Sequence, residues 1–217
     1  MTSSLPDDDT LTETGLELRS RGRVLLIACG ALAREILALT RLNGWSHIDL
    51  ACLPAKLHNR PALIPEAVRG RIQRARKQGY TGIHVVYADC GTGGLLDRVC
   101  EEEGVSRIEG PHCYSFFDGN DAFAERSEDE VGAFYLTDFL ARQFDALVWR
   151  GMGLDRHPEL RDLYFGNYDR VVFLAQTEDP ALETRARAAA DRLGLAFEKR
   201  VTGYGDLAGF VSAAAQG

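Results

Sequence analysis

The chain has 217 residues, of which 45% are hydrophobic and 26% are charged, and its formal net charge at pH 7 is −7. A chain of this length can bury enough apolar surface to fold without a disulfide scaffold. Its negative charge disfavours nucleic acid or an anionic membrane as the main partner. No apolar run approaches the ~20 residues of a membrane span, and the N-terminus lacks the basic and apolar regions of a signal peptide. We therefore expect a cytoplasmic protein whose five cysteines are reduced thiols.

The first 20 residues are polar and acidic without a clear period, so we expect a flexible N-terminal tail (1–20) followed by one α/β domain (21–217). From Val24 onwards, short apolar runs alternate with helical patterns. The predicted strands are 24–29, 48–53, 82–88, 106–109, 170–175 and 196–201. The predicted helices are 31–42, 65–78, 95–103, 180–193 and a short helix after Asp206.

This alternation of strands and helices predicts an α/β fold with a mainly parallel, doubly wound, Rossmann-like sheet. Residues 120–168 show helical and looped patterns rich in aromatic residues, with no predicted strand. If the domain consists of two tightly packed lobes, the polar stretch near 118–130 is where the chain divides.

Side chains that bind soft metals follow four successive predicted strands. Cys29 ends the first strand, and His58 lies in the loop after the second. Cys90 follows the third strand, and Cys113 lies a few residues past the fourth. Ligands of open α/β sheets bind beyond the carboxyl ends of the strands, so we expect these four side chains to meet there. Three thiolates and an imidazole are a donor set that zinc takes in a tetrahedron; iron or an iron–sulfur cluster is the lesser alternative.

Free cysteine is also among the most buried residue types, so simple packing is the competing interpretation of the cysteines. It fits Cys52 and Cys100, which fall inside a predicted strand and a predicted helix. His112 is either a surface histidine or a substitute metal ligand. The histidines expected to be structural or exposed are His47, His84 and His157.

A glycine-rich turn connects the third predicted strand to a helix. The backbone N–H groups of Gly91, Thr92, Gly93 and Gly94 could hold an anion such as a phosphate or carboxylate. The alternative is that the glycines only permit a tight turn. Farther along, Tyr135 and Thr137 could line the site, with core packing and a helix cap as the other interpretation.

Two other chemistries can be weighed against a metal site. The segment after the first strand stands where a dinucleotide fingerprint would, but alanine replaces the first and third glycines of GxGxxG, so we expect neither nicotinamide nor flavin. Cys90 could instead be a nucleophile for amide or acyl hydrolysis. Its pKa would be lowered by a helix N-terminus, with His58 or His112 as the base. That interpretation leaves the other two cysteines at strand ends unexplained.

Six short motifs occur in order along the chain: Cys29-Gly30, residues 57–61 (LHNRP), 87–91 (YADCG), His112-Cys113, 134–137 (FYLT) and 168–173 (YDRVVF). Together they resemble an uncharacterised bacterial and archaeal family, domain of unknown function 1638. The resemblance implies a cytosolic α/β protein encoded near corrinoid-dependent methyltransferases, and it supplies no reaction. Ala88, Asp89 and His112 depart from the residues common at these positions in the family, which makes His112 an alternative fourth ligand.

The sequence therefore predicts a zinc site formed by Cys29, His58, Cys90 and Cys113. We expect the protein to act on or handle a small molecule in corrinoid-linked one-carbon metabolism. Its partners would be a small-molecule substrate or proteins of a corrinoid methyltransferase system. A non-enzymatic accessory protein for a metal or a corrinoid is the alternative class, and the oligomeric state is open.

Overall fold

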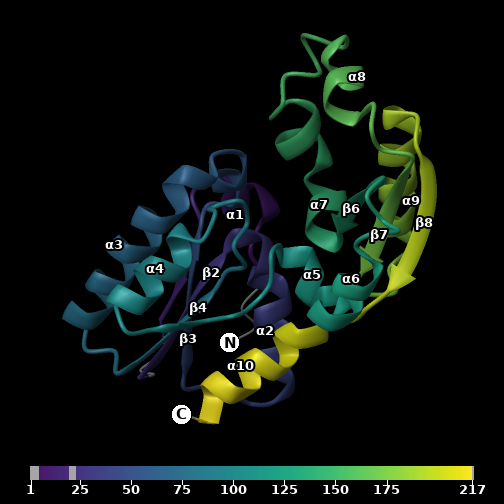
Figure 1. Ribbon diagram of the computed structural model, residues 1–217. Coiled ribbons are helices and arrows are strands. Elements are labelled where there is room, and N and C mark those ends of the chain that lie inside the picture. Colours follow the sequence, from purple (N-terminus) through teal and green to yellow (C-terminus); the bar gives the residue numbers. More distant parts are fainter. Residues whose placement is uncertain (1–4, 20–22, 217) are drawn as a thin grey trace. The chain divides into compact units, whose positions relative to one another are not determined.

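A computed structural model describes residues 5–19 and 23–216, which divide into two compact units (Figure 1). Within the described residues, unit 1 runs up to Cys113 and resumes at Asp206, and unit 2 comprises Tyr114–Gly205. The division thus falls slightly before the predicted break near 118–130. The C-terminal helix belongs to unit 1, an association between distant segments that local sequence patterns do not reveal.

Unit 1 is built on a five-stranded sheet in the order β1-β3-β2-β4-β5. Its strands are β1 (Leu16–Leu18), β2 (Val24–Cys29), β3 (Ile48–Leu53), β4 (Gly82–Val86) and β5 (Ser106–Arg107). Every residue of β2 is buried, because this continuous apolar run lies between two parallel neighbours, β3 and β4. β5 continues the parallel arrangement, and β1 pairs with β3 in the antiparallel direction.

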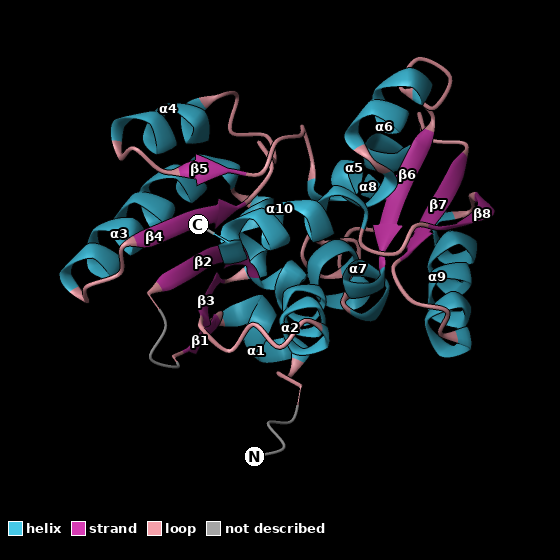
Figure 2. Cartoon of the chain, turned by 90° about the horizontal axis from the view of Figure 1, so that it is seen from below, coloured by secondary structure: helices cyan, strands magenta, loops and turns pink. Residues whose placement is uncertain are grey.

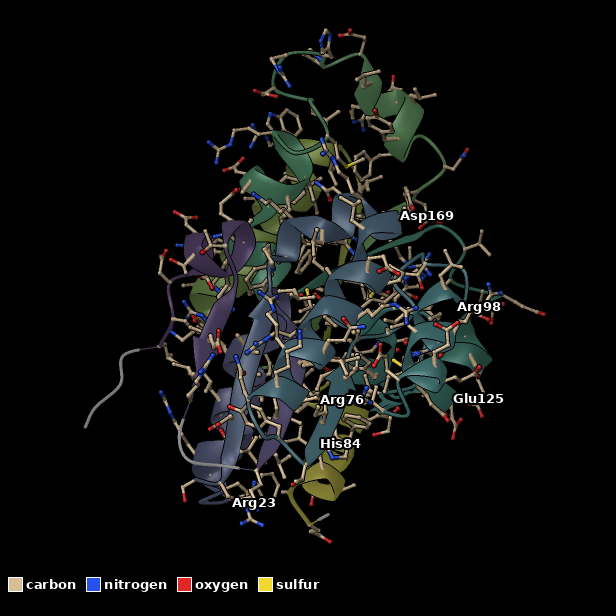
Figure 3. The ribbon with its side chains drawn as sticks, turned by 90° about the vertical axis from the view of Figure 1, so that its left-hand side faces the viewer. Arg23, Arg76, His84, Arg98, Glu125 and Asp169 are labelled. Atoms are coloured by element: carbon tan, nitrogen blue, oxygen red, sulfur yellow. The ribbon has the colours of Figure 1, made fainter. Side chains whose placement is uncertain are left out.

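Helices pack on both faces of this sheet. Figure 1 shows α3 and α4 together on one face, and α2 and α10 on the other. The helices of unit 1 are α1 (Asp8–Glu13), α2 (Ala33–Leu42), α3 (Ile64–Lys77), α4 (Leu95–Glu102) and α10 (Gly205–Gln216). His84 of β4 lies edge-on to Phe210 of α10 with the two rings 6.3 Å apart, and Figure 3 shows His84 beside this helix.

The predicted N-terminal tail is not a tail over residues 8–18, which form α1 and β1. The Asp7 side chain caps α1 by accepting a hydrogen bond from the backbone N–H of Thr10. Leu11 is fully buried, and Gly15 approaches the backbone of Cys52 so closely that a β-carbon there would lie 2.1 Å from the Cys52 carbonyl oxygen. These contacts are tertiary, so a search for local periodicity does not reveal them. Residues 1–4 and 20 of the predicted tail lie outside the described residues.

Unit 2 contains a parallel three-stranded sheet in the order β6-β7-β8 (Figure 2). The strands are β6 (Ala133–Thr137), β7 (Arg170–Ala175) and β8 (Ala196–Val201). The helices are α5 (Cys113–Asp118), α6 (Asn120–Arg126), α7 (Asp138–Arg142), a π-helical turn η4 (Asp145–Trp149), α8 (Leu160–Phe165) and α9 (Pro180–Leu193). β6 lies in the stretch 120–168, for which the sequence predicts no strand.

Residues of β7 alternate between the two faces of this sheet. Val171 and Phe173 pack in a core that includes residues of α7 and α9. Val172 and Leu174 pack in a smaller core that includes Tyr135, Tyr114 and Phe123. The predicted α/β class and the mostly parallel strands are confirmed. Among the described residues, no helix is long and apolar enough to cross a membrane.

Candidate functional site

The first three candidate ligands follow the carboxyl ends of neighbouring parallel strands in unit 1. Cys29 is the last residue of β2 and pairs in register with Leu53 at the end of β3. His58 lies in a 3₁₀ turn (Ala55–Asn59) after β3, and Cys90 follows β4 after three intervening residues. Because β2, β3 and β4 are parallel, these residues leave the sheet at the same edge.

Backbone hydrogen bonds bring the fourth candidate to this edge. The N–H of Asp89 donates to the Gly110 carbonyl at 3.0 Å, and the N–H of Cys90 donates to the Pro111 carbonyl at 2.9 Å. The chain after β5 therefore runs beside the turn after β4. As a result, the Sγ atoms of Cys90 and Cys113 lie 3.3 Å apart.

Cys90 has an unusual backbone and an acidic thiol. Its φ of 51° is the only positive φ of a non-glycine residue in the described part of the chain, and such strain is frequent at functional sites. A hydrogen bond from the Cys113 thiol, aided by the His58 imidazole, lowers the pKa of Cys90 to about 5 against the opposing effect of burial. The pKa of the Cys113 thiol is raised well above its usual value. The Cys90 thiol is therefore the more acidic of the two, with Cys113 as its hydrogen-bond donor.

Cys29 belongs to the same group of side chains. Burial raises the pKa of its thiol to about 12, although the Ala31 N–H opposes this, and the charge of Cys90 raises it further. Beside it lies Tyr87, which is 1% exposed. The Tyr87 hydroxyl has no regular hydrogen-bond partner among the described residues, yet it is close enough to the Cys29 thiol to lower that thiol's pKa. We refer to Cys29, His58, Tyr87, Cys90 and Cys113 as the thiol cluster.

His112 lies at the border of the thiol cluster. Burial lowers the pKa of its imidazole, and the charges of Cys90, His58 and Asp89 also act on it. It is half-buried rather than a fully exposed loop histidine. His58 hydrogen-bonds to the Cys90 sulfur, which favours His58 over His112 as the ligand.

The thiol cluster is not arranged as a finished metal site. Over residues 5–19 and 23–216, no group of three or more His, Cys, Asp or Glu side chains stands in a geometry that could hold a metal ion. The Sγ atoms of Cys90 and Cys113, 3.3 Å apart, are close enough to bind a common ion.

Comparison with known proteins identifies the family of the chain but indicates no activity. A family model described as "Protein of unknown function (DUF1638)" matches residues 52–211, about three quarters of the chain. The chain belongs to the DUF1638 family. No curated protein and no solved structure matches it. The DUF1638 match contains His58, Cys90 and Cys113, and it begins after Cys29.

The glycine-rich turn within the DUF1638 match already holds an anion, the carboxylate of Asp89. The N–H groups of Gly91, Gly93 and Gly94 donate to it at 3.2, 3.1 and 2.8 Å, and the Thr92 hydroxyl donates at 2.7 Å. Burial would raise the pKa of Asp89, but these hydrogen bonds lower it. The donors predicted to bind an external anion are thus engaged internally and shape the turn that presents Cys90.

Tyr135 and Thr137, the residues of the motif at 134–137 that were predicted to line the binding site, have structural contacts in unit 2. Thr137 caps α7 by accepting a hydrogen bond from the N–H of Leu140, which is the helix-cap interpretation of this residue. Tyr135 stacks on Tyr114 with ring centroids 4.8 Å apart, and its hydroxyl donates to Glu130. Their part in a binding site stays a prediction.

The cysteines and histidines outside the thiol cluster are buried in secondary-structure elements or have surface contacts. Cys52 and Cys100 are buried within β3 and α4. The exposed His47 bonds to the Ala215 carbonyl oxygen, and the exposed His157 pairs with Glu159. The residue that the sequence analysis missed is Tyr87. Tyr87 is the first residue of the motif at residues 87–91, and its place in that motif is the sequence feature that could have identified it.

Proposed function

We propose that the thiol cluster binds one soft divalent metal ion, zinc by preference, through Cys29, His58, Cys90 and Cys113. The observation that carries the proposal is the 3.3 Å distance between the Cys90 and Cys113 sulfur atoms. The His58 imidazole is hydrogen-bonded to the Cys90 sulfur. Two thiolates and an imidazole are preferred zinc ligands. Iron or an iron–sulfur cluster is the alternative occupant of the same donors.

The distance between the Cys90 and Cys113 sulfur atoms supports shared binding of one ion after a small adjustment. Tetrahedral zinc with Zn–S bonds of ~2.3 Å holds two sulfur atoms ~3.8 Å apart. The sulfur pair at 3.3 Å would therefore open by about half an ångström as the ion replaces the shared proton. The proton on Cys29 would also leave on binding, because a thiol binds zinc as thiolate. The buried Tyr87 hydroxyl would then gain an anionic partner.

We further infer that unit 1 is a doubly wound, Rossmann-like domain. The strand order β3-β2-β4-β5, with helices on both faces, supports this interpretation. The edge that holds the thiol cluster would then be the edge where such folds bind ligands. Reduced free cysteines support a cytoplasmic location.

The role of the site follows from the family resemblance alone. We propose that the protein handles a small molecule, or serves as an accessory protein for metal or corrinoid, in corrinoid-linked methyl metabolism. An ion with one exchangeable ligand could act as a Lewis acid or activate a substrate thiol or water. Cys29 is the candidate for that exchangeable position, because burial raises the pKa of its thiol and it precedes the segment that the family model matches.

A second candidate function is nucleophilic catalysis by Cys90. The lowered pKa of this thiol and its contact with His58 favour it. A thiolate at a strand-to-helix turn could attack the carbonyl carbon of an ester or amide and form a thioester as the C–O or C–N bond breaks. The imidazole would protonate the departing alcohol or amine and then take a proton from the water that hydrolyses the thioester to the free acid and the Cys90 thiolate. Cys113 would then stabilise the resting thiolate.

Cobalt binding tests the metal proposal with a readout that needs no substrate. Purified, chelator-treated protein is titrated with Co²⁺ under anaerobic conditions, and the absorption of thiolate-to-cobalt charge transfer is recorded. We expect saturation at one equivalent, displacement by zinc, loss of the band in Cys113→Ala and a weaker, altered band in His58→Ala. Cys100→Ala, which removes a packing cysteine, is the matched control and should bind as the wild type does.

The same samples distinguish the second candidate. Absence of a saturable cobalt band in folded wild-type protein contradicts the metal proposal. If that protein also forms a covalent acyl adduct on Cys90 with an activated ester, the nucleophile interpretation is favoured. Zinc that suppresses acylation in proportion to its occupancy supports the metal proposal.

A further inference from the structure

Unit 2 contains an arginine-lined cleft that is formed by residues of this unit alone. It lies between α9 and the segment that comprises α7 and η4, and its volume is about 250 Å³. The residues that line the cleft are Ala141, Arg142, Phe144, Asp145, Arg185, Ala188, Ala189 and Arg192.

The spacing of residues on α9 explains the shape of the cleft. Arg185, Ala188, Ala189 and Arg192 share one helical face, and the two arginines are two turns, or about 10 Å, apart. The alanines between them have no side chain beyond the β-carbon, so they leave a hollow between two long cationic side chains. Phe144 and Ala141 provide an apolar floor from the facing segment.

Positive charge predominates in the cleft. Three guanidinium groups line the cleft. Among the lining residues in the described part of the chain, Asp145 carries the only carboxylate. Arg192 pairs with Asp145 at 2.5 Å and lies over the Trp149 ring at 3.7 Å from its centroid. Arg185 is exposed and makes no hydrogen bond or ion pair within the described part of the chain.

The third arginine enters the cleft from the facing segment. Nε and Nη2 of Arg142 are buried, and its charge also acts on the buried carboxylate of Asp138. Arg142 is therefore partly buried at the cleft, whereas Arg185 is exposed. Guanidinium groups match the oxygen spacing of phosphates and carboxylates and bind them through paired N–H donors.

We propose that this cleft binds a small phosphate-bearing molecule. Its volume admits a phosphate with a short organic body and excludes a large polyanion from the interior. Arg185 and Arg142 hold the oxyanion, and the alanine and Phe144 surface takes the apolar part. Arg192 would be drawn from Asp145 towards the ligand, which changes its contact with Trp149. The proposal does not depend on the thiol cluster.

Trp149 provides the readout for the test. The full chain carrying Trp45→Phe retains Trp149 as its only tryptophan. At fixed ionic strength it is titrated with inorganic phosphate and with pyrophosphate while tryptophan fluorescence is recorded, and calorimetry checks the stoichiometry. We expect saturable binding of pyrophosphate at one equivalent, and a Kd raised about tenfold or more by Arg185→Ala because one paired oxyanion contact is lost.

The control variant is Arg156→Ala, which removes the same charge from an exposed arginine that does not line the cleft. Its Kd should equal that of the parent. Neither Arg185 nor Arg156 is buried, so both variants should fold, and circular dichroism verifies this. The absence of saturable binding, or equal weakening by Arg185→Ala and Arg156→Ala, would overturn the proposal.

Discussion

The sulfur atoms of Cys90 and Cys113 lie 3.3 Å apart although 23 positions separate the two residues in the sequence. The link between them is backbone: Asp89 and Cys90 donate hydrogen bonds to Gly110 and Pro111. Pairing of the chain after β5 with the turn after β4 thus creates a thiol pair that neither segment has alone. The shape of that turn depends on Asp89 and on the backbone of Cys90.

Replacement of Asp89 by alanine should loosen the turn that presents Cys90. The substitution removes the acceptor of three N–H groups and one hydroxyl, of which water can replace some. We expect a loss of about 1–2 kcal/mol in the free energy of unfolding, measured by urea denaturation. Glu101→Ala, which removes an exposed carboxylate on α4, is the control. Equal effects of the two variants would show that Asp89 does not organise the turn.

The positive φ of Cys90 can be tested with a pair of variants that both lack the thiol. At φ 51° glycine is unstrained and alanine is not, so Cys90→Gly should be more stable than Cys90→Ala by about 1 kcal/mol in urea unfolding. The same pair at Cys100, inside α4, should show the opposite sign, because glycine destabilises a helix interior. The same sign at both sites would contradict backbone strain at Cys90.

Glu130 should make the stability of unit 2 depend on pH. Burial would raise the pKa of this carboxyl, but hydrogen bonds from Arg200 and Tyr135 and the charges of Arg200 and Arg126 lower it below its usual 4.5. Because the folded-state pKa is lowered, the carboxylate stabilises the fold above about pH 4.5, and this contribution is lost as the pH falls through the folded-state value.

Glu130→Gln should therefore unfold more easily at pH 7, by about 1–2 kcal/mol, and approach the wild type below pH 4. Urea denaturation at several pH values measures the difference. Glu159→Gln, at an exposed carboxyl beside His157, is the control and should show no comparable pH-dependent loss. A Glu130→Gln deficit that grows at acid pH would contradict the proposed charge network.

The sequence was informative wherever the pattern was continuous and local. The bounds of β2, β3, β7, β8 and α9 equal the predicted ranges. β2, β3 and β7 are largely apolar runs, and α9 begins at a capping aspartate and ends at a glycine. β6 was missed because it has five residues and passes directly into a helix cap. α1 and β1 were missed because tertiary contacts to Cys52 and Gly30 hold them.

The candidate site was predictable in part for the same reason. Strand ends locate Cys29 and Cys90 and bring the loop of His58 to the same edge. The sequence could not show that the Asp89 carboxylate occupies the glycine-rich turn, since either a ligand or a side chain can satisfy such a turn. Nor could it show that the Tyr87 hydroxyl is buried beside Cys29, because that follows from packing around β4.

The metal content of anaerobically purified protein tests the central claim most directly. Elemental analysis is made on the wild type, Cys90→Ala and the control Cys100→Ala, with circular dichroism to verify folding. The account predicts about one equivalent of zinc per chain in the wild type and in Cys100→Ala, and its loss in Cys90→Ala. A folded wild-type protein without metal that takes up neither zinc nor iron on reconstitution would contradict it.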